Sequence, residues 1–306
     1  MFHSLYLENA KTGKNNWWRY LFTLLGSLGL ASIAAGLIIA LIVVIYTVLN
    51  YPVISPDMIN TLISINNPLF IILITGVTYA VSFFLFYLFV RFLHHKNFKM
   101  LVNYGVGFRW RMLLKGGFIW FVILSLLSFP DFLLNPGAYQ VSLNFEAFYL
   151  LLGLSALVFP VQASFEELLF RGYLMQGISL ISERPIIPLL LTSTLFGLVH
   201  FFNGANLDQS LSIVVSTFLI GLMLGIIALA DNGLETAMGV HIVNNLFVAL
   251  IFNSADSGLP GLPSLITAPA SNPFTGIPFL ILAVILMLVV LYWNQMRKLG
   301  EIFGAK

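Results

Sequence analysis

Hydrophobic positions fall into eight long blocks that are separated by short polar connections. The blocks lie near residues 21–49, 69–93, 112–134, 146–175, 186–203, 211–230, 235–253 and 275–294. Each holds about 18–30 residues, and a helix needs roughly 20 to cross the hydrocarbon core of a bilayer. No block alternates apolar and polar positions as the strands of a membrane β-barrel do. The pattern predicts an all-α fold, a polytopic membrane helical bundle of about eight transmembrane helices.

The composition agrees with this fold class. Of the 306 residues, 59% are hydrophobic and only 8% are charged, and the mean hydropathy is +0.97. A soluble domain is roughly 45–50% apolar and about 25% charged. No polar stretch is long enough for a soluble domain. We expect a cytosolic N-terminal segment at 1–20, a single membrane domain at 21–294 and a cytosolic C-terminal tail at 295–306.

Basic residues predict the orientation of the bundle. The four connections near 50–68, 135–145, 204–210 and 254–274 contain no Lys or Arg. The side with the termini and the other connections, including the block ends beside them, collects Lys11, Lys14, Arg19, Arg91, Lys96, Lys99, Arg109, Arg111, Lys115, Arg184, Arg297, Lys298 and Lys306. Basic residues concentrate on the cytoplasmic side of membrane proteins, so we expect both termini in the cytoplasm.

Three smaller expectations concern the connections and one helix. His94 and His95 lie in a basic loop, where we expect solvent to surround them. The connection from Leu259 to Pro273 carries four prolines and should be irregular. A Gly-x-x-x-Gly pair in the sixth block, Gly221 and Gly225, predicts close helix packing inside the bundle.

Charge and cysteine content exclude several function classes. The chain has 14 basic and 12 acidic residues, a net charge of +2, and no basic stripe that would bind nucleic acid. It has no cysteine, which excludes disulfides, a thiol nucleophile, thiolate-bound zinc and iron–sulfur clusters. The expected partners are therefore the lipid bilayer and a substrate within or at the membrane.

A few ionisable or polar side chains lie well inside the blocks, where each one is costly and marks a candidate site. They are Glu166, Glu167 and Arg171 in the fourth block, His200 in the fifth, and His241 and Asn245 in the seventh. The positions of these residues along their blocks would let the fourth, fifth and seventh helices meet in one pocket nearer to the cytoplasmic side.

Helical spacing separates their expected roles. Glu167 and Arg171 are four residues apart, so they share a helix face and can form an ion pair. Glu166 points about 100° away and is less well paired, which makes it the candidate general base. His241 and Asn245 are also four residues apart and share a face.

Two chemistries fit these residues. In the first, Glu166 with His200 activates water, and His241 with Asn245 donates hydrogen bonds to an oxyanion, as peptide hydrolysis requires. In the second, Glu166, His200 and His241 bind one zinc ion with an open position. The residues alone leave both open. The sequence lacks His-Glu-x-x-His, Gly-x-Ser-x-Gly and a deep pair of aspartates, which excludes the other intramembrane protease chemistries.

Two rival functions use the same side chains. Buried acids, bases and imidazoles also form the proton relays of coupled transporters, although no internal repeat of the kind common in transporters is visible. A catalytically idle membrane scaffold or immunity protein on the same fold is the other alternative, and it predicts tolerance of Glu166→Gln.

The motifs also resemble those of a known family. Glu-Glu-x-x-x-Arg, Phe-x-x-x-His and His-x-x-x-Asn occur in this order at Glu166–Arg171, Phe196–His200 and His241–Asn245. Together they resemble the CPBP family of CAAX-protease and bacteriocin-processing membrane proteins, which includes the type II CAAX prenyl endopeptidase. The resemblance covers about residues 150–250, and we expect the catalytic core at about 146–253.

The resemblance implies an intramembrane endopeptidase with a cavity that opens toward the cytosol. In this family the first glutamate is held to activate water with the first histidine, and the second histidine and the asparagine to form the oxyanion hole. Carried over, these roles fall on Glu166, His200, His241 and Asn245, with Glu167 and Arg171 in support. The implied substrate is a membrane-anchored or lipidated protein or peptide, including prenylated CAAX-type proteins, cleaved near its C-terminus. No cofactor is required in this interpretation, and zinc is the alternative.

Overall fold

A computed structural model describes residues 5–50, 67–142, 144–182 and 184–303. Within these residues, seven helices are long and apolar enough to cross a membrane. They run over Trp17–Ile45, Pro68–Leu93, Trp110–Leu134, Phe145–Ser179, Ile186–Asn203, Leu207–Asp231 and Ile277–Gln295. The predicted block at 235–253 is also helical, but at Glu235–Ile251 it is shorter than the other seven. The all-α polytopic bundle is therefore confirmed, with one of the eight expected helices shorter than a full span.

The start of the membrane domain differs slightly from the expected one. The first helix begins at Trp17 rather than near residue 21, so it includes Arg19, whose guanidinium carbon lies 4.5 Å from the centroid of the Trp18 ring. Most of the connection at 50–68, and Lys306 in the tail, lie outside the described residues.

Most of the membrane-spanning helices consist of shorter α-helical, π-helical and 3₁₀ elements. The α-helices are α1 (Leu5–Glu8), α2 (Trp17–Leu24), α3 (Ala31–Asn50), α5 (Pro68–Leu88), α6 (Lys99–Val102), α7 (Trp110–Leu134), α8 (Phe145–Glu167), α9 (Met175–Ser179), α10 (Ile186–Leu198), α11 (Leu207–Asp231), α12 (Glu235–Leu246), α13 (Ile277–Tyr292) and α14 (Met296–Ile302). Segments of π-helix are η2 (Leu25–Leu30), η3 (Phe89–Leu93), η5 (Leu168–Leu174) and η7 (Phe247–Ile251). The 3₁₀ turns are η1 (Asn9–Lys11), η4 (Pro136–Ala138), η6 (Phe201–Asn203) and η8 (Trp293–Gln295).

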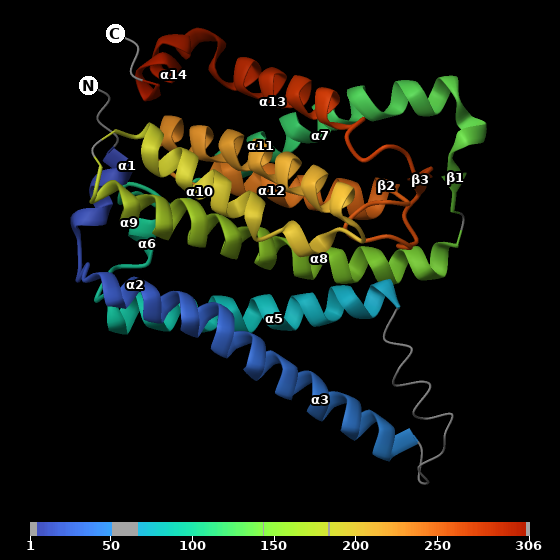
Figure 1. Ribbon diagram of the computed structural model, residues 1–306, viewed down its shortest axis with the longest axis horizontal. Helices are drawn as coiled ribbons and strands as arrows, with labels where there is room; N and C mark the ends of the chain where they lie inside the picture. The colour runs from blue at the N-terminus through green and yellow to red at the C-terminus, as the bar shows by residue number, and fades with distance from the viewer. Residues whose placement is uncertain (1–4, 51–66, 143, 183, 304–306) are drawn as a thin grey trace.

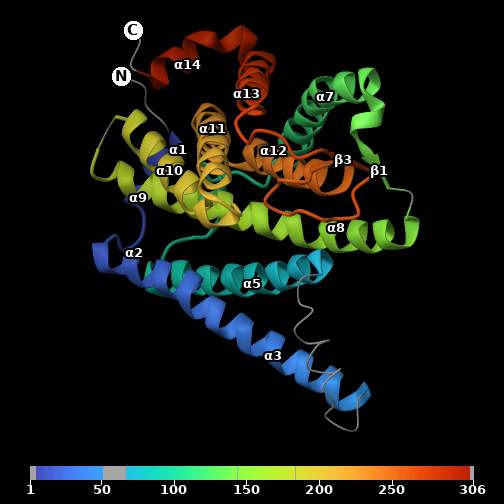
Figure 2. The same cartoon turned by 45° about the vertical axis from the view of Figure 1, so that its right-hand side comes forward.

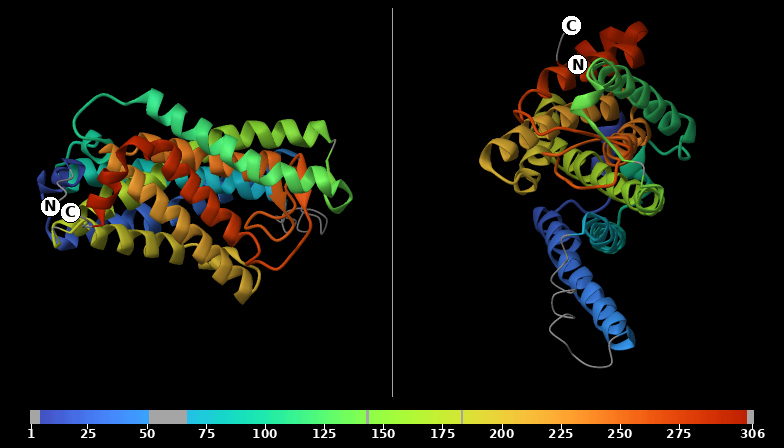
Figure 3. Two further views of the ribbon diagram at one scale, coloured as in Figure 1. Left: turned by 90° about the horizontal axis from the view of Figure 1, so that it is seen from above. Right: turned by 90° about the vertical axis from the view of Figure 1, so that its right-hand side faces the viewer.

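Helix α8 runs along the middle of the bundle (Figure 1). Helix α5 lies along one side of it, and α10, α11 and α12 lie on the other side, while α3 diverges from the bundle beyond α5 (Figure 2). Both termini lie at one end, and the three short strands lie at the opposite end (Figure 3). We call these ends the terminal end and the sheet end.

Helices α7 and α12 approach each other unusually closely, through glycines. A Cβ atom built on Gly239 would lie 1.9 Å from the carbonyl oxygen of Leu113, and one on Gly116 would lie 2.6 Å from that of Thr236. Real Cβ atoms never approach other atoms this closely, so only glycine fits at these positions. The contact fixes α12, which carries two of the predicted site residues.

The glycines of the sixth block also pack inside the bundle. A Cβ on Gly225 would lie 2.4 Å from Cδ1 of Leu189 on α10, and one on Gly221 would lie 3.0 Å from a guanidinium nitrogen of Arg171 on η5. The structure therefore agrees with the expected role of this Gly-x-x-x-Gly pair in helix packing.

A three-stranded sheet joins two connections at the sheet end. Strand β3 (Ile266–Ala268) pairs antiparallel with β1 (Gln140–Val141) and parallel with β2 (Phe252–Ser254). The expectation that 259–273 is wholly irregular is wrong for β3. Its prolines flank the strand, and the β-branched Ile266 and Thr267 between them favour extended backbone.

The terminal end buries a histidine that we expected to be solvated. His94 is 1% exposed; its Nδ1 donates to the carbonyl oxygen of Lys14 at 2.8 Å, and its Nε2 accepts from the Tyr173 hydroxyl at 2.7 Å. His95 is exposed, as expected. Burial lowers the pKa of His94 to about 4. The N-terminal segment packs against this loop and encloses His94. The local sequence pattern does not predict such long-range contacts.

This histidine predicts that stability depends on pH. Because the folded-state pKa of His94 lies below its usual value near 6.5, the unfolded chain binds more protons between these values, and stability falls as pH falls through this window. We expect the Tm of detergent-solubilised protein to decrease from about pH 7 to about pH 5. His94→Gln, whose amide can donate and accept, should flatten this slope.

The adjacent His95 provides the matched control. Its φ is +51°, a conformation that asparagine tolerates, so His95→Asn should keep the wild-type slope. An unchanged slope in His94→Gln would contradict the assignment.

Candidate active site

Glu166 lies in the last turn of α8 and is 4% exposed. Its Oε1 atom accepts hydrogen bonds from the hydroxyl of Tyr79 on α5 and, at 3.3 Å, from Nε2 of Gln162. Its Oε2 atom has no hydrogen-bond partner among the described residues and lies 3.5 Å from Nε2 of His241. One oxygen of this carboxylate is thus held by donors, and the other is available for chemistry.

Glu167 joins α8 to α12. Its Oε1 atom accepts from Nη1 of Arg171 at 2.7 Å and from Nδ1 of His241 at 2.8 Å. Arg171 is fully buried in η5, and its Nη2 donates to the carbonyl oxygen of Gly221 at 3.1 Å. The Glu167–Arg171 pair that the spacing predicts is present, and it also orients the imidazole of His241. Segments of π-helix such as η5 are frequent at functional sites.

The buried cluster of Glu166, Glu167, Arg171 and His241 becomes electrically neutral when it binds one further proton. Two carboxylates and one guanidinium carry a net charge of −1, so one further proton makes the buried group neutral, the favourable state in a medium of low dielectric constant. Nδ1 of His241 donates to Glu167, so Nε2 of His241 and Oε2 of Glu166 are the two positions for that proton. A proton on His241 leaves Glu166 as an ionised base.

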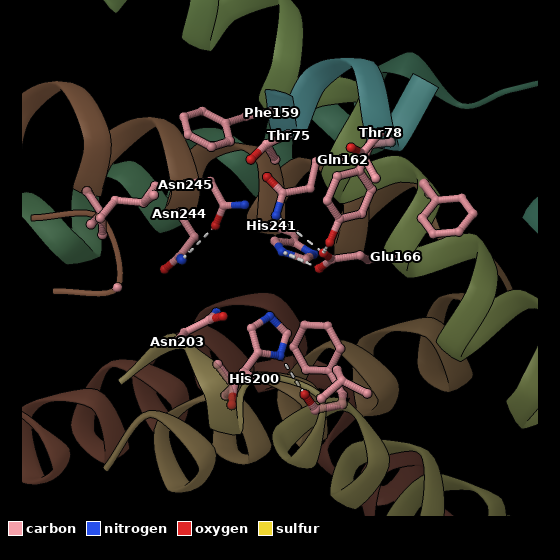
Figure 4. Close-up of a pocket in the computed structure, with 18 of the residues that line it drawn as sticks. Thr75, Thr78, Phe159, Gln162, Glu166, His200, Asn203, His241, Asn244 and Asn245 are labelled. Carbon is pink, nitrogen blue, oxygen red and sulfur yellow. Dashed lines mark hydrogen bonds and ion pairs between the residues drawn. The ribbon is translucent and has the colours of Figure 1, made fainter. Parts of the chain in front are cut away.

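His200 lies on the opposite wall. It follows α10, and its Nδ1 donates to the carbonyl oxygen of Phe196 at 2.7 Å, which leaves Nε2 as an acceptor. The ring of Phe196 lies between the two histidines, 4.8 Å from that of His200 and 5.8 Å from that of His241. Figure 4 shows His200 facing Glu166 and His241 across the cavity.

Asn245 is oriented by a relay of side chains from the buried Trp120. The indole Nε1 of Trp120 donates to Oδ1 of Asn244 at 3.2 Å, and Nδ2 of Asn244 donates to Oδ1 of Asn245 at 3.3 Å. An indole only donates, so it fixes which way the first amide points and, through it, the second. The Nδ2 donor of Asn245 is therefore left for the cavity.

These side chains line one cavity of about 690 Å³. Glu166, His200, His241 and Asn245 all face it, whereas Glu167 and Arg171 do not belong to its lining. The sequence predicted that the three helices meet, and they do. Thr75, Thr78 and Asn203 add further polar groups to the lining (Figure 4).

The three side chains that would bind zinc in the alternative chemistry are not grouped around one point. Within the described part of the chain, no three His, Cys, Asp or Glu side chains are close enough to hold a metal ion. Glu166 and His241 are neighbours, but His200 lies across the cavity (Figure 4). The three residues do not fit a zinc ion as they are arranged.

Sequence reasoning missed four contributors. Tyr79, Gln162, Trp120 and Asn244 position the predicted residues, yet none carries a formal charge. The available signal was weak: Gln162 is one turn before Glu166, and Asn244 precedes Asn245, so both are polar residues inside an apolar block. Tyr79 and Trp120 are amphipathic and are common in membrane helices.

Comparisons with known proteins bear on the same region. Residues 147–247 match the family model described as type II CAAX prenyl endopeptidase Rce1-like. Over 294 residues, 96% of this chain and 97% of the relative, the sequence is 27% identical to a Bacillus subtilis (strain 168) protein named "Uncharacterized protein YyaK". No solved structure matches. The matched segment contains every predicted site residue, so over this region the chain is similar to the Rce1-like type II CAAX prenyl endopeptidases, and its seven long apolar helices make it an integral membrane protein.

Proposed function

We propose that this chain is a glutamate-dependent intramembrane endopeptidase. It hydrolyses a peptide bond near the C-terminus of a membrane-tethered protein or peptide, with prenylated CAAX-type substrates as the first class to test. Glu166 and His200 activate water, and His241 and Asn245 stabilise the oxyanion. The observation that carries the proposal is the asymmetric carboxylate of Glu166, with Oε1 held by two donors and Oε2 unbonded beside a cavity.

The proposed reaction begins with a water molecule in the cavity. Oε2 of Glu166 accepts a proton from the water as the water oxygen attacks the scissile carbonyl carbon. Nε2 of His200 accepts a hydrogen bond from the same water. The carbonyl oxygen becomes an oxyanion, and the Nε2 proton of His241 and the Nδ2 amide of Asn245 donate to it. The C–N bond then breaks, and the proton on Glu166 passes to the leaving amine.

The hydrogen bond from Tyr79 that positions Glu166 should contribute to the rate of peptide cleavage. Tyr79→Phe removes a donor to Oε1 and lets the carboxylate rotate, so we expect kcat to fall about 10- to 100-fold, the lower part of the range for general-base contributions, while KM changes little. The exposed Tyr87 of the same helix is the control, and Tyr87→Phe should match wild type. An unchanged kcat, or a loss confined to KM, would argue against a positioning role for Tyr79.

The metal alternative gives a second prediction. Because the catalytic step is assigned to protein groups, cleavage should change by less than about twofold after incubation with EDTA or 1,10-phenanthroline. Loss of activity in chelator, restored by zinc, would instead establish metal dependence.

The decisive test uses purified protein in detergent with a quenched farnesylated CAAX peptide and its unprenylated counterpart. Mass spectrometry should identify a single cleavage near the C-terminus. A correctly folded wild type that cleaves neither peptide would favour the idle-scaffold or transporter alternatives.

A further inference from the structure

Tyr6 of the short helix α1 is fully buried, and its ring belongs to the hydrophobic core of the bundle. Its backbone amide donates to Oδ1 of Asn232, directly after α11, at 3.1 Å. Its hydroxyl has a single hydrogen, which it shares between the carbonyl oxygens of Leu101 at 2.6 Å and of Arg171 at 3.3 Å. Tyr6 therefore links the N-terminal segment to α6, to η5 and to the end of α11.

The carbonyl of Arg171 belongs to the residue that organises the buried charges of the candidate site. From its side chain, Nη1 donates to Oε1 of Glu167 at 2.7 Å, and the same oxygen accepts from Nδ1 of His241 at 2.8 Å. Arg171 lies in the π-helix η5, and such segments are rare and occur mostly as single-turn interruptions of α-helices. A donor from outside the helix therefore helps to fix the backbone from which this guanidinium extends.

The same N-terminal segment also supports the helix of the proposed oxyanion donors. Nδ2 of Asn9, a residue that is 3% exposed, donates to the carbonyl oxygens of Met100 at 2.9 Å and of Asn103 at 3.1 Å. Asn103 in turn donates from its own Nδ2 to Oε1 of Glu235, the first residue of α12, at 2.6 Å. The N-terminal segment thus contacts η5 directly and reaches α12 through one intermediate residue.

Tyr6 can affect the chemistry only through its neighbours. It is not among the residues that line the cavity, so its hydroxyl does not reach a substrate bound there. The hydroxyl holds the backbone of Arg171, the guanidinium holds Glu167, and Glu167 orients the imidazole of His241. Without the first contact Arg171 can shift, and the imidazole of His241 shifts with it.

We propose that Tyr6 is a positioning residue of the active site, and that the N-terminal segment is required for the full rate of cleavage. The hydroxyl of Tyr6 fixes Arg171 and, through Glu167, aligns the Nε2 proton of His241 with the oxyanion. This assignment rests on the proposed peptidase function. It extends the active site beyond residues 147–247, the segment that matches the family model.

Tyr6→Phe is the first test, because phenylalanine keeps the buried ring and removes only the hydroxyl. We expect kcat to fall about 3- to 30-fold, less than the roughly 10²-fold that a misplacement of about 1 Å can cost. KM should stay within about twofold of the wild-type value, because the weakened interaction is made in the transition state. Both constants are measured well below the Tm of the variant.

Tyr173→Phe is the matched control. Tyr173 lies in the same π-helix as Arg171 and is 3% exposed, but its hydroxyl donates to Nε2 of His94 at 2.7 Å and not to a residue of the candidate site. The control should lower the Tm, because a buried hydrogen bond is lost, and keep kcat close to that of wild type. Equal losses of kcat in both variants would indicate a general loosening of η5 and would overturn the proposal, as would a wild-type kcat in Tyr6→Phe.

A measurement that needs no activity keeps this proposal separate from the peptidase function. Protein labelled with ¹⁵N-histidine in detergent micelles gives an Nδ1–H resonance for His241, identified by its loss in His241→Asn. The resonance should shift in Tyr6→Phe and stay in place in Tyr173→Phe. An unmoved resonance in Tyr6→Phe would overturn the positioning role even if the rate falls. If wild type cleaves no peptide, the peptidase function fails, and the histidine spectrum alone decides the role of Tyr6.

Asn232→Gly covers the case in which Tyr6→Phe does not fold. Asn232 has a φ of +51°, which glycine adopts readily, and the substitution removes the acceptor of the Tyr6 amide. We expect the same two changes with smaller amplitude, a lower kcat and a shifted His241 resonance. An unmoved resonance or an unchanged kcat in this variant would overturn the proposal.

Discussion

We expect Glu166→Gln to reduce cleavage by about 10²- to 10⁴-fold, the contribution of a positioned general base, and to leave the fold intact. Glutamine has the same shape, and its Oε1 still accepts from Tyr79 and Gln162. It lacks the second carboxylate oxygen and cannot take a proton from water. The expected signature is a loss in kcat for any substrate that wild type cleaves, with a Tm close to that of wild type.

Glu146 is the matched control for this substitution. It lies on the same helix, α8, and is exposed in the first turn, so Glu146→Gln removes one carboxylate without touching the cavity. It should keep wild-type activity. Retention of more than a tenth of the wild-type rate by Glu166→Gln would show that another group is the base and would favour the idle-scaffold interpretation of this glutamate.

The second large effect is on stability. In Gly239→Ala the new methyl group would lie 1.9 Å from the carbonyl oxygen of Leu113, and backbone cannot move aside as a flexible side chain can. Helices α7 and α12 must separate. We expect a cost at the upper end of the roughly 1–3 kcal/mol of overpacking, and a Tm lowered by roughly 5–10 °C. Activity falls as well, because His241 and Asn245 move with α12.

Gly153 offers a control with the same chemical change. It lies within α8, and a Cβ there meets nothing within 4 Å, so Gly153→Ala should be neutral or stabilising by up to about 1 kcal/mol through helix propensity. Equal Tm values for the two variants would mean that α7 and α12 are not packed through Gly239.

Local sequence spacing predicted part of the site, and long-range packing supplied the rest. The Glu167–Arg171 pair follows from the helical repeat, and the costly interior positions of Glu166, His200 and His241 mark the site because few other side chains there are ionisable. The donor from Tyr79 is 87 residues away from Glu166, and nothing in an apolar helix indicates which neighbour it faces.

The same reasoning explains the errors at the ends of the bundle. A basic loop predicts a histidine that is exposed to solvent, but Lys14 and Tyr173 enclose His94. These contacts depend on tertiary folding. Prolines predict irregular backbone, but three residues between them suffice for β3. Hydropathy gave the order of the spans well because length and apolar content alone determine whether a helix can cross a bilayer.

The sheet also determines when in biosynthesis the site is complete. Gln140 of β1 pairs with Thr267 of β3, so this pairing waits for the intervening chain, whose synthesis takes roughly 6–25 s at about 5–20 residues per second. The cavity wall at residues 257–262 lies between β2 and β3, which pair with each other. A nascent chain with its first six helices already carries Glu166 and His200 but lacks His241, Asn245 and this wall. The proposed active site is therefore complete only near the end of translation, after nearly all of the described helices have been synthesised.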